Sequence, residues 1–405
     1  MNLTIAHPNG HCKGILQITG SKSETNRLLL LQALFSGFEV ENKSNSDDSK
    51  VMEAALKSEE STIDIHHAGT AMRFLTAFFS HQEGRDIILT GSKRMQERPI
   101  KILVDALRYL GASISYVKNE GYPPLKIEGK IIKGGKVTLP ADVSSQYISA
   151  LLMLGPTLEQ GITLSLEGKI TSVPYIQMTL SLLKNFGVST HFEGNVIQVD
   201  FQPNLLRKTQ VVESDWSSAS YFFSIVALSN SASIELRSYK KNSLQGDAIL
   251  MDIYRLLGVE SYIEGHSLFL KKKNVKLPER IRWDLTTAPD IAQTIAVSCF
   301  GLGVGCDLEG LHTLKIKETD RLEALNTELS KIGAKIKVTE KSLHLAPGGS
   351  LKPNCSIPTY NDHRMALAFA PLGLKIPITI EEADVVSKSY PDYWTDLKIL
   401  NFNIL

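Results

Sequence analysis

The chain has 405 residues, of which 43% are hydrophobic and 21% are charged. This is the composition of a globular protein, and the length exceeds what one hydrophobic core usually serves, so two or more domains are expected. The 44 basic and 43 acidic residues leave a formal net charge of +1, which argues against a nucleic-acid binder or a protein held on a membrane surface by charge.

Targeting and metal-binding signals are absent from the sequence. No stretch approaches the ~20 apolar residues that a membrane helix needs, and the first residues do not resemble an export signal, so we expect a cytoplasmic protein. The spacing of Cys12, Cys299, Cys306 and Cys355 does not fit a zinc site, and we expect reduced thiols and no metal. Cys299 lies in an apolar run and is predicted to be a core residue.

A short polar cluster followed at once by an apolar pattern of helical period recurs along the chain. In chain order, it predicts helices at residues 21–36, 69–79, 144–155, 217–228, 289–300 and 362–373. From Thr70 onward the starts are separated by 74, 73, 72 and 73 residues, whereas the first step, from Ser23 to Thr70, is 47 residues. Such a period indicates six copies of one structural unit.

A second kind of helix lies between the first kind and ends in Gly-Ala or Gly-Val. It is predicted at residues 104–112, 180–188, 251–259 and 325–334, because glycine after the last apolar position is a helix stop. Short alternating segments follow, such as residues 113–117 and 335–338, and these predict strands. The unit is therefore strand, helix, strand, helix and a strand hairpin, and six such units form two bodies of three more naturally than one solenoid.

Cations accompany the predicted helix starts. Serine, threonine and aspartate are common there simply as caps, but a nearby arginine opposes the helix dipole unless an anion lies between them. The cations are Lys22, Arg27, Arg73, Arg98, Lys317, Arg321, Arg364 and Lys388. Because helix N-termini also bind anions, we expect several starts to converge on one or two small, highly anionic molecules.

Seven motifs in order then give the sequence a family resemblance. They are GSKSETNR at 20–27, AGTAMR at 68–73, ERP at 97–99, VSSQ at 143–146, KETDR at 317–321, YNDHR at 360–364 and KSYPD at 388–392. Together they cover nearly the whole chain and resemble the 5-enolpyruvylshikimate-3-phosphate (EPSP) synthases. The resemblance implies an α/β fold, a two-domain inside-out α/β barrel with three βαβαββ repeats per domain and the active site between the domains. It places the N-terminal domain at residues 20–211 and the C-terminal domain at residues 1–19 plus 212–405.

The resemblance also implies a reaction. A member transfers the enolpyruvyl group of phosphoenolpyruvate to the 5-hydroxyl of shikimate 3-phosphate and releases phosphate, through a tetrahedral intermediate. This step leads toward chorismate and the aromatic amino acids, is a target of glyphosate and needs no cofactor. We expect a monomer whose partners are these two small molecules, with no nucleic acid and no membrane.

Site residues are carried over from the matching motifs. The residues implied for shikimate 3-phosphate are Lys22, Ser23, Arg27, Ser144, Ser145, Gln146, Ser172, Tyr175, Asp290, Thr313 and Lys317. Those implied for phosphoenolpyruvate are Lys22, Gly69, Arg98, Gln146, Arg321, Arg364 and Lys388. The catalytic groups implied are Lys22, Asp290 and Glu318, and two carboxylates with a lysine suit the proton transfers at the 5-hydroxyl and at C3.

Two other functions stay open on the sequence. A UDP-N-acetylglucosamine enolpyruvyl transferase shares the fold and the donor, but that family carries a reactive cysteine in a loop for which residues 84–100 here offer none. A non-catalytic repeat protein that binds an anion would not need both Asp290 and Glu318. His67, Phe74, Trp216 and Thr313 depart from the family's common pattern, which bears on ligand affinity and on the response to inhibitors.

Overall fold

The chain folds into two compact units. The computed structural model describes residues 1–405 apart from residues 36, 142, 143, 171, 172 and 354. Unit 1 comprises Met1–Gly20 and Glu213–Leu405, and unit 2 comprises Ser21–Val212. These limits lie one residue beyond the domain limits expected from the sequence at each crossing. That the units correspond to the two domains of the family stays a prediction.

The described residues of unit 1 form three four-stranded sheets of one pattern. In each sheet the first two strands are parallel and the other neighbours antiparallel. One is β2-β13-β15-β14, with β2 His11–Gln17, β13 Ser231–Arg237, β15 Ser267–Lys272 and β14 Val259–Glu264. The next is β16-β17-β19-β18, with β16 Arg280–Asp284, β17 Gly305–Glu309, β19 Leu343–Leu345 and β18 Ile336–Val338. The third is β20-β21-β1-β22, with β20 Cys355–Ile357, β21 Ile378–Ile380, β1 Leu3–Ala6 and β22 Asn403–Ile404.

Unit 2 repeats the pattern in two four-stranded sheets and shortens it in a third. One is β4-β5-β7-β6, with β4 Thr62–Asp64, β5 Asp86–Thr90, β7 Leu125–Glu128 and β6 Ser113–Tyr116. Another is β8-β9-β11-β10, with β8 Gly135–Pro140, β9 Ile162–Glu167, β11 Val196–Val199 and β10 Thr190–Glu193. The third sheet is the parallel pair of β12 (Thr209–Val211) and β3 (Glu39–Glu41).

The expected hairpin is therefore missing from one repeat, within the part of the chain that the structure describes. The sequence step from Ser23 to Thr70 is 47 residues, against 74 from Thr70 to Ser144. That difference leaves too few residues for two further strands and their turn, so the sheet keeps its parallel pair alone.

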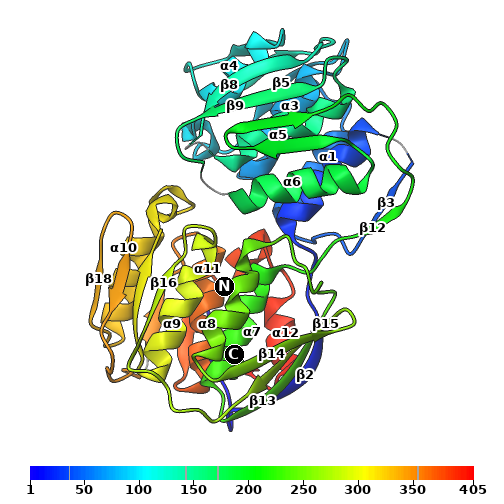
Figure 1. Ribbon diagram of the computed structural model, residues 1–405. Coiled ribbons are helices and arrows are strands. Elements are labelled where there is room, and N and C mark those ends of the chain that lie inside the picture. The colour runs from blue at the N-terminus through cyan, green and yellow to red at the C-terminus, as the bar shows by residue number, and fades with distance from the viewer. Residues whose placement is uncertain (36, 142–143, 171–172, 354) are drawn as a thin grey trace. The chain divides into compact units, whose positions relative to one another are not determined.

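The helices that begin at the polar clusters lie inside each unit. In unit 1 these are α7 (Trp216–Leu228), α9 (Ala292–Leu302) and α11 (His363–Phe369), which are buried on nearly every face and pack on one another. In unit 2 they are α1 (Lys22–Leu34), α3 (Gly69–Ser80) and α5 (Ser145–Leu154). A helix that is apolar all round must be buried, and Figure 1 shows the sheets of unit 1 outside its central helices.

This arrangement is the inside-out α/β architecture that the resemblance implied, and the fold class is confirmed. The described strands form separate sheets rather than one closed, hydrogen-bonded barrel. The second helix type is also confirmed, as α4 (Lys101–Tyr109), α6 (Val173–Asn185), α8 (Leu250–Arg255) and α10 (Arg321–Lys331). The glycines after them have positive φ, as a helix stop requires: Gly111, Gly187, Gly258 and Gly333.

The remaining helices connect these elements. Two are α-helices, α2 (Asp47–Lys57) and α12 (Tyr393–Ile399). The short 3-10 turns are η1 Met95–Glu97, η2 Gly155–Thr157, η3 Gly246–Ile249, η4 Pro289–Ile291, η5 His312–Ile316, η6 Ala370–Leu374 and η7 Ala383–Lys388. Of these turns, η4 directly precedes the central helix α9 and belongs to its start, whereas η2 and η6 directly follow α5 and α11.

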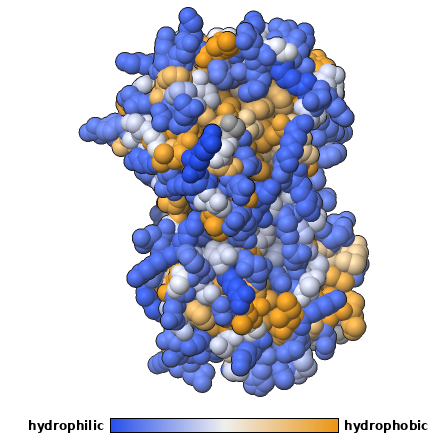
Figure 2. Space-filling view, turned by 90° about the vertical axis from the view of Figure 1, so that its right-hand side faces the viewer, coloured by the Kyte–Doolittle hydropathy of each residue, from blue (hydrophilic) through white to orange (hydrophobic). Residues whose placement is uncertain are grey.

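Core and surface agree with the composition. Cys299 is fully buried on α9, as predicted, in the same hydrophobic core of unit 1 as Trp216 and Phe222. On the visible face of each unit, hydrophilic residues predominate and apolar patches are separate (Figure 2). Across the described residues, every helix falls short of the length and apolarity that crossing a bilayer requires.

Candidate active site

In unit 1 a buried arginine gathers three carboxylates. Arg321, the first residue of α10, is 2% exposed. Its Nε donates to Asp362 Oδ2 at 2.6 Å, its Nη1 to Asp290 Oδ1 at 2.9 Å and its Nη2 to Glu318 Oε2 at 2.7 Å. Burial alone lowers the pKa of Arg321, but the charges of Asp362, Glu318 and Asp290 outweigh burial and raise it. The cation is thus held charged inside the unit.

Asp290 is shared by two further cations. Its side chain is 16% exposed and lies in η4. Lys317 Nζ is 3.5 Å from Oδ1, and Arg364 Nη2 is 3.4 Å from Oδ2. Arg364 Nη1 also donates to the Asp290 carbonyl at 3.1 Å. The structure therefore brings together five predicted residues of unit 1: Asp290, Lys317, Glu318, Arg321 and Arg364.

Two other predicted residues of unit 1 are Lys388 and Thr313. Lys388, at the end of η7, donates from Nζ to the carbonyl of Asn361 at 2.7 Å, which ties it to the segment that carries Arg364. Thr313 lies in η5, and its Oγ1 is buried without a hydrogen-bond partner among the described residues. A buried hydroxyl without a partner costs free energy, so a ligand oxygen that reached Thr313 would stabilise it.

In unit 2, Arg27 connects three helices. It is 2% exposed, and its Nε and Nη2 donate to Thr179 Oγ1 at 2.8 Å and Ser149 Oγ at 2.9 Å. Its Nη1 donates to the Ser23 carbonyl at 2.8 Å, and its Nη2 to the Tyr175 carbonyl at 3.4 Å. Burial among these neutral groups lowers the pKa of Arg27 to about 10. Ser23, Arg27 and Tyr175 are thus neighbours.

A second group in unit 2 surrounds the start of α3. A Cβ on Gly69 would lie 2.5 Å from Arg98 Nη1, so the guanidinium lies directly against the helix start. Arg73 donates from Nη2 to the Pro99 carbonyl at 3.0 Å. Gln146, in the first turn of α5, donates from Nε2 to Thr70 Oγ1 at 3.0 Å. Gly69, Arg98 and Gln146 are therefore brought together, as the resemblance implied for phosphoenolpyruvate.

The remaining predicted residues of unit 2 lie at helix starts or outside the described chain. Ser144 is the N-cap of α5 and accepts from the Gln146 backbone N–H at 3.3 Å, and Ser145 is 7% exposed. Lys22 begins α1, and its Nζ is 3.4 Å from Asp48 Oδ2. Ser172 lies outside the described residues.

The arginines of the two units have different partners. Beside Arg321 and Arg364, Asp290 and Asp362 supply negative charge from within the chain. Arg27 and Arg73 instead donate to hydroxyl, carbonyl and thioether groups. The expectation that several helix starts converge on small anionic molecules stays a prediction.

Sequence reasoning missed several members of the unit 1 cluster. Asp362 is fully buried, accepts from the Arg364 backbone N–H at 2.8 Å and pairs with Arg321. As a capping residue before a helix it could have been found from the sequence. Its pairing with Arg321 could not, because 41 residues separate them. Ser217 and Asp247 also contact this cluster; Ser217 stands at a predicted helix start, whereas Asp247 gave no signal in the sequence.

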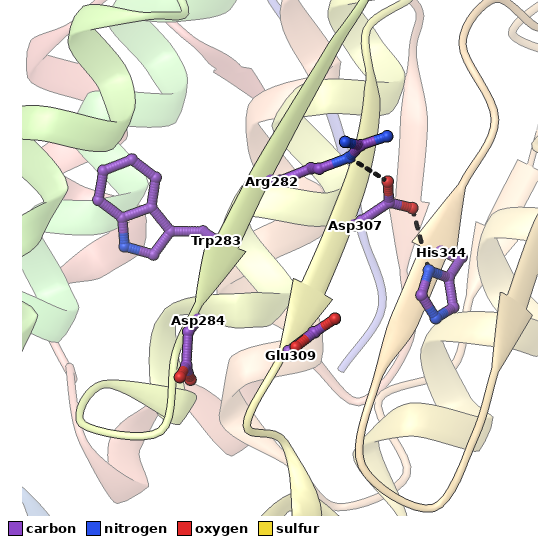
Figure 3. Close-up of a pocket in the computed structure, with 6 residues that line it drawn as sticks. All are labelled: Arg282, Trp283, Asp284, Asp307, Glu309 and His344. Atoms are coloured by element: carbon purple, nitrogen blue, oxygen red, sulfur yellow. Dashed lines mark hydrogen bonds and ion pairs between the residues drawn. The ribbon is translucent and has the colours of Figure 1, made fainter.

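A surface cavity of unit 1 lies apart from all these residues. It has a volume of about 420 Å³ and is lined by Arg282, Trp283, Asp284, Asp307, Glu309 and His344. Figure 3 shows Asp307 between Arg282 and His344, from which it lies 3.3 Å (Nε) and 3.0 Å (Nδ1). The cavity contains none of the predicted residues, so it is not the candidate site.

Solved structures identify the class of fold. The chain superposes on the EPSP synthase of Acinetobacter baumannii with a TM-score of 0.81 and 23% identity, covering 100% of this chain and 99% of that one. The enolpyruvyl transferase NikO from Streptomyces tendae gives a TM-score of 0.76 and 14% identity, covering 100% and 98%. At these identities the likeness shows the fold alone, which is that of enolpyruvyl transferases.

Sequence relatives identify the family. A 3-phosphoshikimate 1-carboxyvinyltransferase of Bacteroides fragilis (strain ATCC 25285) is 49% identical over 398 residues, covering 97% of this chain and 96% of the relative. Its namesake from Tolumonas auensis is 36% identical over 425 residues, covering 98% of each. The family model of EPSP synthase (3-phosphoshikimate 1-carboxyvinyltransferase) matches residues 39–397. The chain belongs to the EPSP synthase family.

Proposed function

We propose that the chain is a 3-phosphoshikimate 1-carboxyvinyltransferase. The 5-hydroxyl oxygen of shikimate 3-phosphate attacks C2 of phosphoenolpyruvate while C3 gains a proton, giving a tetrahedral intermediate. The bond from C2 to the phosphate oxygen then breaks, C3 loses a proton, and the enolpyruvyl ether and inorganic phosphate leave. The observation that carries the proposal is the cluster around Arg321, in which two candidate acid–base carboxylates meet cations suited to an anionic substrate.

The unit 1 cluster supports separate roles for its members. Asp290 is the base toward the 5-hydroxyl, since a carboxylate fixed by Arg321 and Arg364 offers acceptor oxygens in a set orientation. Glu318, whose side chain is 35% exposed, shares the proton steps at C3 and at the phosphate with Lys22. Arg321, Arg364 and Lys388 bind phosphoenolpyruvate, and its arrival redistributes guanidinium N–H groups that the carboxylates now occupy.

Unit 2 supplies the other ligands in this proposal. Its residues for shikimate 3-phosphate are Lys22, Ser23, Arg27, Ser144, Ser145, Gln146, Ser172 and Tyr175. Arg98, with Gly69 against it, binds phosphoenolpyruvate. In unit 1, the residues proposed for shikimate 3-phosphate are Asp290, Thr313 and Lys317. Units 2 and 1 would then be the N-terminal and C-terminal domains of the family.

A phosphate-release assay tests the activity. Purified protein is incubated with phosphoenolpyruvate and either shikimate 3-phosphate or UDP-N-acetylglucosamine, and the enolpyruvyl product is identified by mass spectrometry. We expect turnover with shikimate 3-phosphate alone. Turnover with the UDP-sugar alone would show that the UDP-sugar, and not shikimate 3-phosphate, is the acceptor. Binding of phosphoenolpyruvate without product would favour the non-catalytic alternative.

Asp290→Asn tests the catalytic assignment. We expect kcat to fall by about 10²–10⁴-fold, the usual contribution of a general base. The sequence alone leads one to expect little loss of stability, but Arg321 is 2% exposed and bonds directly to Asp290. Weakening that contact is therefore expected to lower the free energy of unfolding by about 1–3 kcal/mol as well. A variant with normal kcat would remove Asp290 from the mechanism.

We also propose that the protein is a cytoplasmic monomer of the shikimate pathway, with no nucleic-acid or membrane partner. The nearly balanced formal charge of +1 supports the absence of a polyanionic partner. Light scattering coupled to size-exclusion chromatography tests the oligomeric state, and a mass near 44.7 kDa is expected. A mass of twice that value at micromolar concentration would contradict the monomer.

A further inference from the structure

Arg364 has a contact besides Asp290 that the proposed mechanism does not use. Its Nη2 donates to Ser217 Oγ at 3.3 Å, and Ser217 Oγ in turn donates to Asp247 Oδ2. Arg364 is in the first turn of α11, Ser217 in the first turn of α7, and Asp247 in η3. Three elements far apart in the sequence therefore meet at one guanidinium.

The two hydrogen bonds that join Arg364, Ser217 and Asp247 can have only one donor–acceptor direction. A guanidinium only donates, so Ser217 Oγ must accept from Arg364. The single hydroxyl proton of Ser217 is then left for Asp247, which as a carboxylate only accepts. Asp247 thus fixes the rotation of the hydroxyl and keeps its lone pair turned toward Arg364.

The segment that carries Asp247 is attached to the start of α7. Gln245 Oε1 accepts from the Trp216 backbone N–H at 3.0 Å, and Gln245 Nε2 donates to the Ser214 carbonyl at 2.9 Å. These bonds fix the position of the segment before η3 relative to the first turn of α7. Asp247 and Ser217 are therefore placed by the backbone of two elements and not by their own contact alone.

Asp247 is costly to bury. It is 6% exposed, and it accepts a hydrogen bond from the hydroxyl of Ser217. Burial, followed by the charge of Asp290, raises the pKa of Asp247 to about 6, and Ser217 and Arg364 lower it in part. A buried carboxylate lowers stability unless its charge is compensated, so its presence beside Arg364 calls for a role in the site.

We propose that Ser217 and Asp247 are positioning residues for phosphoenolpyruvate, and that they hold the Arg364 guanidinium in one orientation before the substrate arrives. The inference rests on the proposed function, in which Arg364 binds phosphoenolpyruvate. With Asp290 on one contact and Ser217 on another, Arg364 loses little side-chain freedom on binding. Without Ser217 that freedom must be lost when the substrate binds, and affinity falls.

The test is a comparison of kinetic constants. Ser217→Ala and Asp247→Ala are each expected to raise KM for phosphoenolpyruvate by about tenfold, the effect of ordering one long side chain on binding. KM for shikimate 3-phosphate and kcat are expected to stay within about twofold of the wild-type values. Ser217→Thr keeps the hydroxyl and is expected to restore the wild-type KM for phosphoenolpyruvate.

Ser224→Ala is the matched control. Ser224 is a buried serine on the same helix that accepts from Ser298 Oγ at 2.8 Å, away from Arg364, and its variant is expected to keep both KM values. The inference is overturned if Ser217→Ala leaves KM for phosphoenolpyruvate unchanged, or if KM rises equally for both substrates in Ser217→Ala and Ser224→Ala. Should Asp247→Ala not fold, Ser217→Ala decides alone.

The proposed function and this inference fail in different ways. A wild-type protein without turnover on shikimate 3-phosphate overturns the function, and the positioning role with it. An active wild type whose Ser217→Ala variant has unchanged kinetics overturns the positioning role and leaves the function standing.

Discussion

At the scale of single residues, neighbours rather than residue type decide what each arginine does. Arg27 and Arg321 are both 2% exposed. Arg27 bonds to hydroxyls and carbonyls, and its pKa is lowered, whereas Arg321 bonds to three carboxylates, and its pKa is raised. Both residues stand out in the sequence as cations near helix starts. Glu318 is near Arg321 in the sequence, but the other two carboxylates lie 31 and 41 residues away, and the hydroxyl partners of Arg27 lie more than 100 residues away, so a motif alone does not reveal these opposite settings.

Gly69→Ala is a prediction at this scale. The added Cβ would lie 2.5 Å from Arg98 Nη1, closer than any real contact, so the guanidinium must shift. We expect KM for phosphoenolpyruvate to rise by at least about tenfold, the cost of misplacing a charged ligand group, while KM for shikimate 3-phosphate changes little. Steady-state kinetics with each substrate varied in turn measure both constants.

The matched control for Gly69→Ala is Gly194→Ala. A Cβ there meets no atom within 4 Å, although φ is +55°, so this variant reports the effect of the same chemical change without the collision. Equal KM values for phosphoenolpyruvate in Gly69→Ala and wild type would show that Arg98 does not bind this substrate.

At the scale of elements, the start of a helix serves two purposes in this fold. Asp362 caps α11 through the Arg364 backbone N–H and also pairs with Arg321. Asp320 caps α10 through the backbone N–H groups of Leu322 and Glu323 and is half-buried. A cap that also neutralises a buried cation carries more of the stability of its unit than a cap that bonds to backbone alone.

We therefore predict unequal losses from two cap deletions. Asp362→Ala leaves the buried Arg321 short of a carboxylate and is expected to lower the free energy of unfolding by about 3–5 kcal/mol. Asp320→Ala removes a cap alone and is expected to cost about 1 kcal/mol. Urea unfolding of both variants, monitored by circular dichroism, measures the difference. Equal losses would mean that the pair with Arg321 contributes nothing beyond capping.

A buried carboxylate on α12 sets a pH dependence. Asp396 is 8% exposed and accepts from Tyr390 Oη at 2.6 Å. Burial raises the pKa of Asp396 from 3.8 to about 6, partly offset by that hydrogen bond. Between these pH values the folded chain binds more protons than the unfolded chain, so the free energy of unfolding falls as the pH rises from about 4 to 6, by up to about 1.4 kcal/mol per pH unit.

Asp396→Asn is expected to remove this contribution. The decline in stability between pH 4 and 6 becomes shallower, and Asp247 keeps part of it, because its pKa is raised in the same sense. Unfolding midpoints in urea at several pH values measure the slope. Asp252→Asn, at an exposed residue paired with Arg255, is the control and is expected to keep the wild-type slope, and an Asp396→Asn variant with that same slope would contradict the prediction.

Elements were more predictable from the sequence than their contacts. The helical period located α3, α5 and α7 to within one residue at each start, because an apolar pattern that must be buried fixes where a helix lies. The hairpin assigned to the repeat of β3 and β12 was wrong. The pattern shared by the six copies does not show that one copy lacks the hairpin. The short step of 47 residues was the signal for it.

At the scale of the whole molecule, the predicted ligands of each substrate come from both units. Ser23, Ser144 and Tyr175 belong to unit 2, whereas Asp290 and Lys317 belong to unit 1. The sequence motifs assign all of these residues to one substrate. In the structure, the residues of each unit are positioned by hydrogen bonds within that unit. If shikimate 3-phosphate binds the residues assigned to it, then its binding must slow hydrogen exchange in both units.

Hydrogen–deuterium exchange with shikimate 3-phosphate alone tests this, because no turnover occurs without phosphoenolpyruvate. We expect slower exchange at the starts of α1 and α5 in unit 2, and at η4 and the start of α10 in unit 1. The protection arises because backbone N–H groups near a bound anion open less often. Inorganic phosphate at equal concentration is the control for a general effect of anions. Protection confined to unit 2 would contradict the assignment of Asp290 and Lys317 to this substrate, and protection confined to unit 1 would contradict the assignment of Ser23, Ser144 and Tyr175.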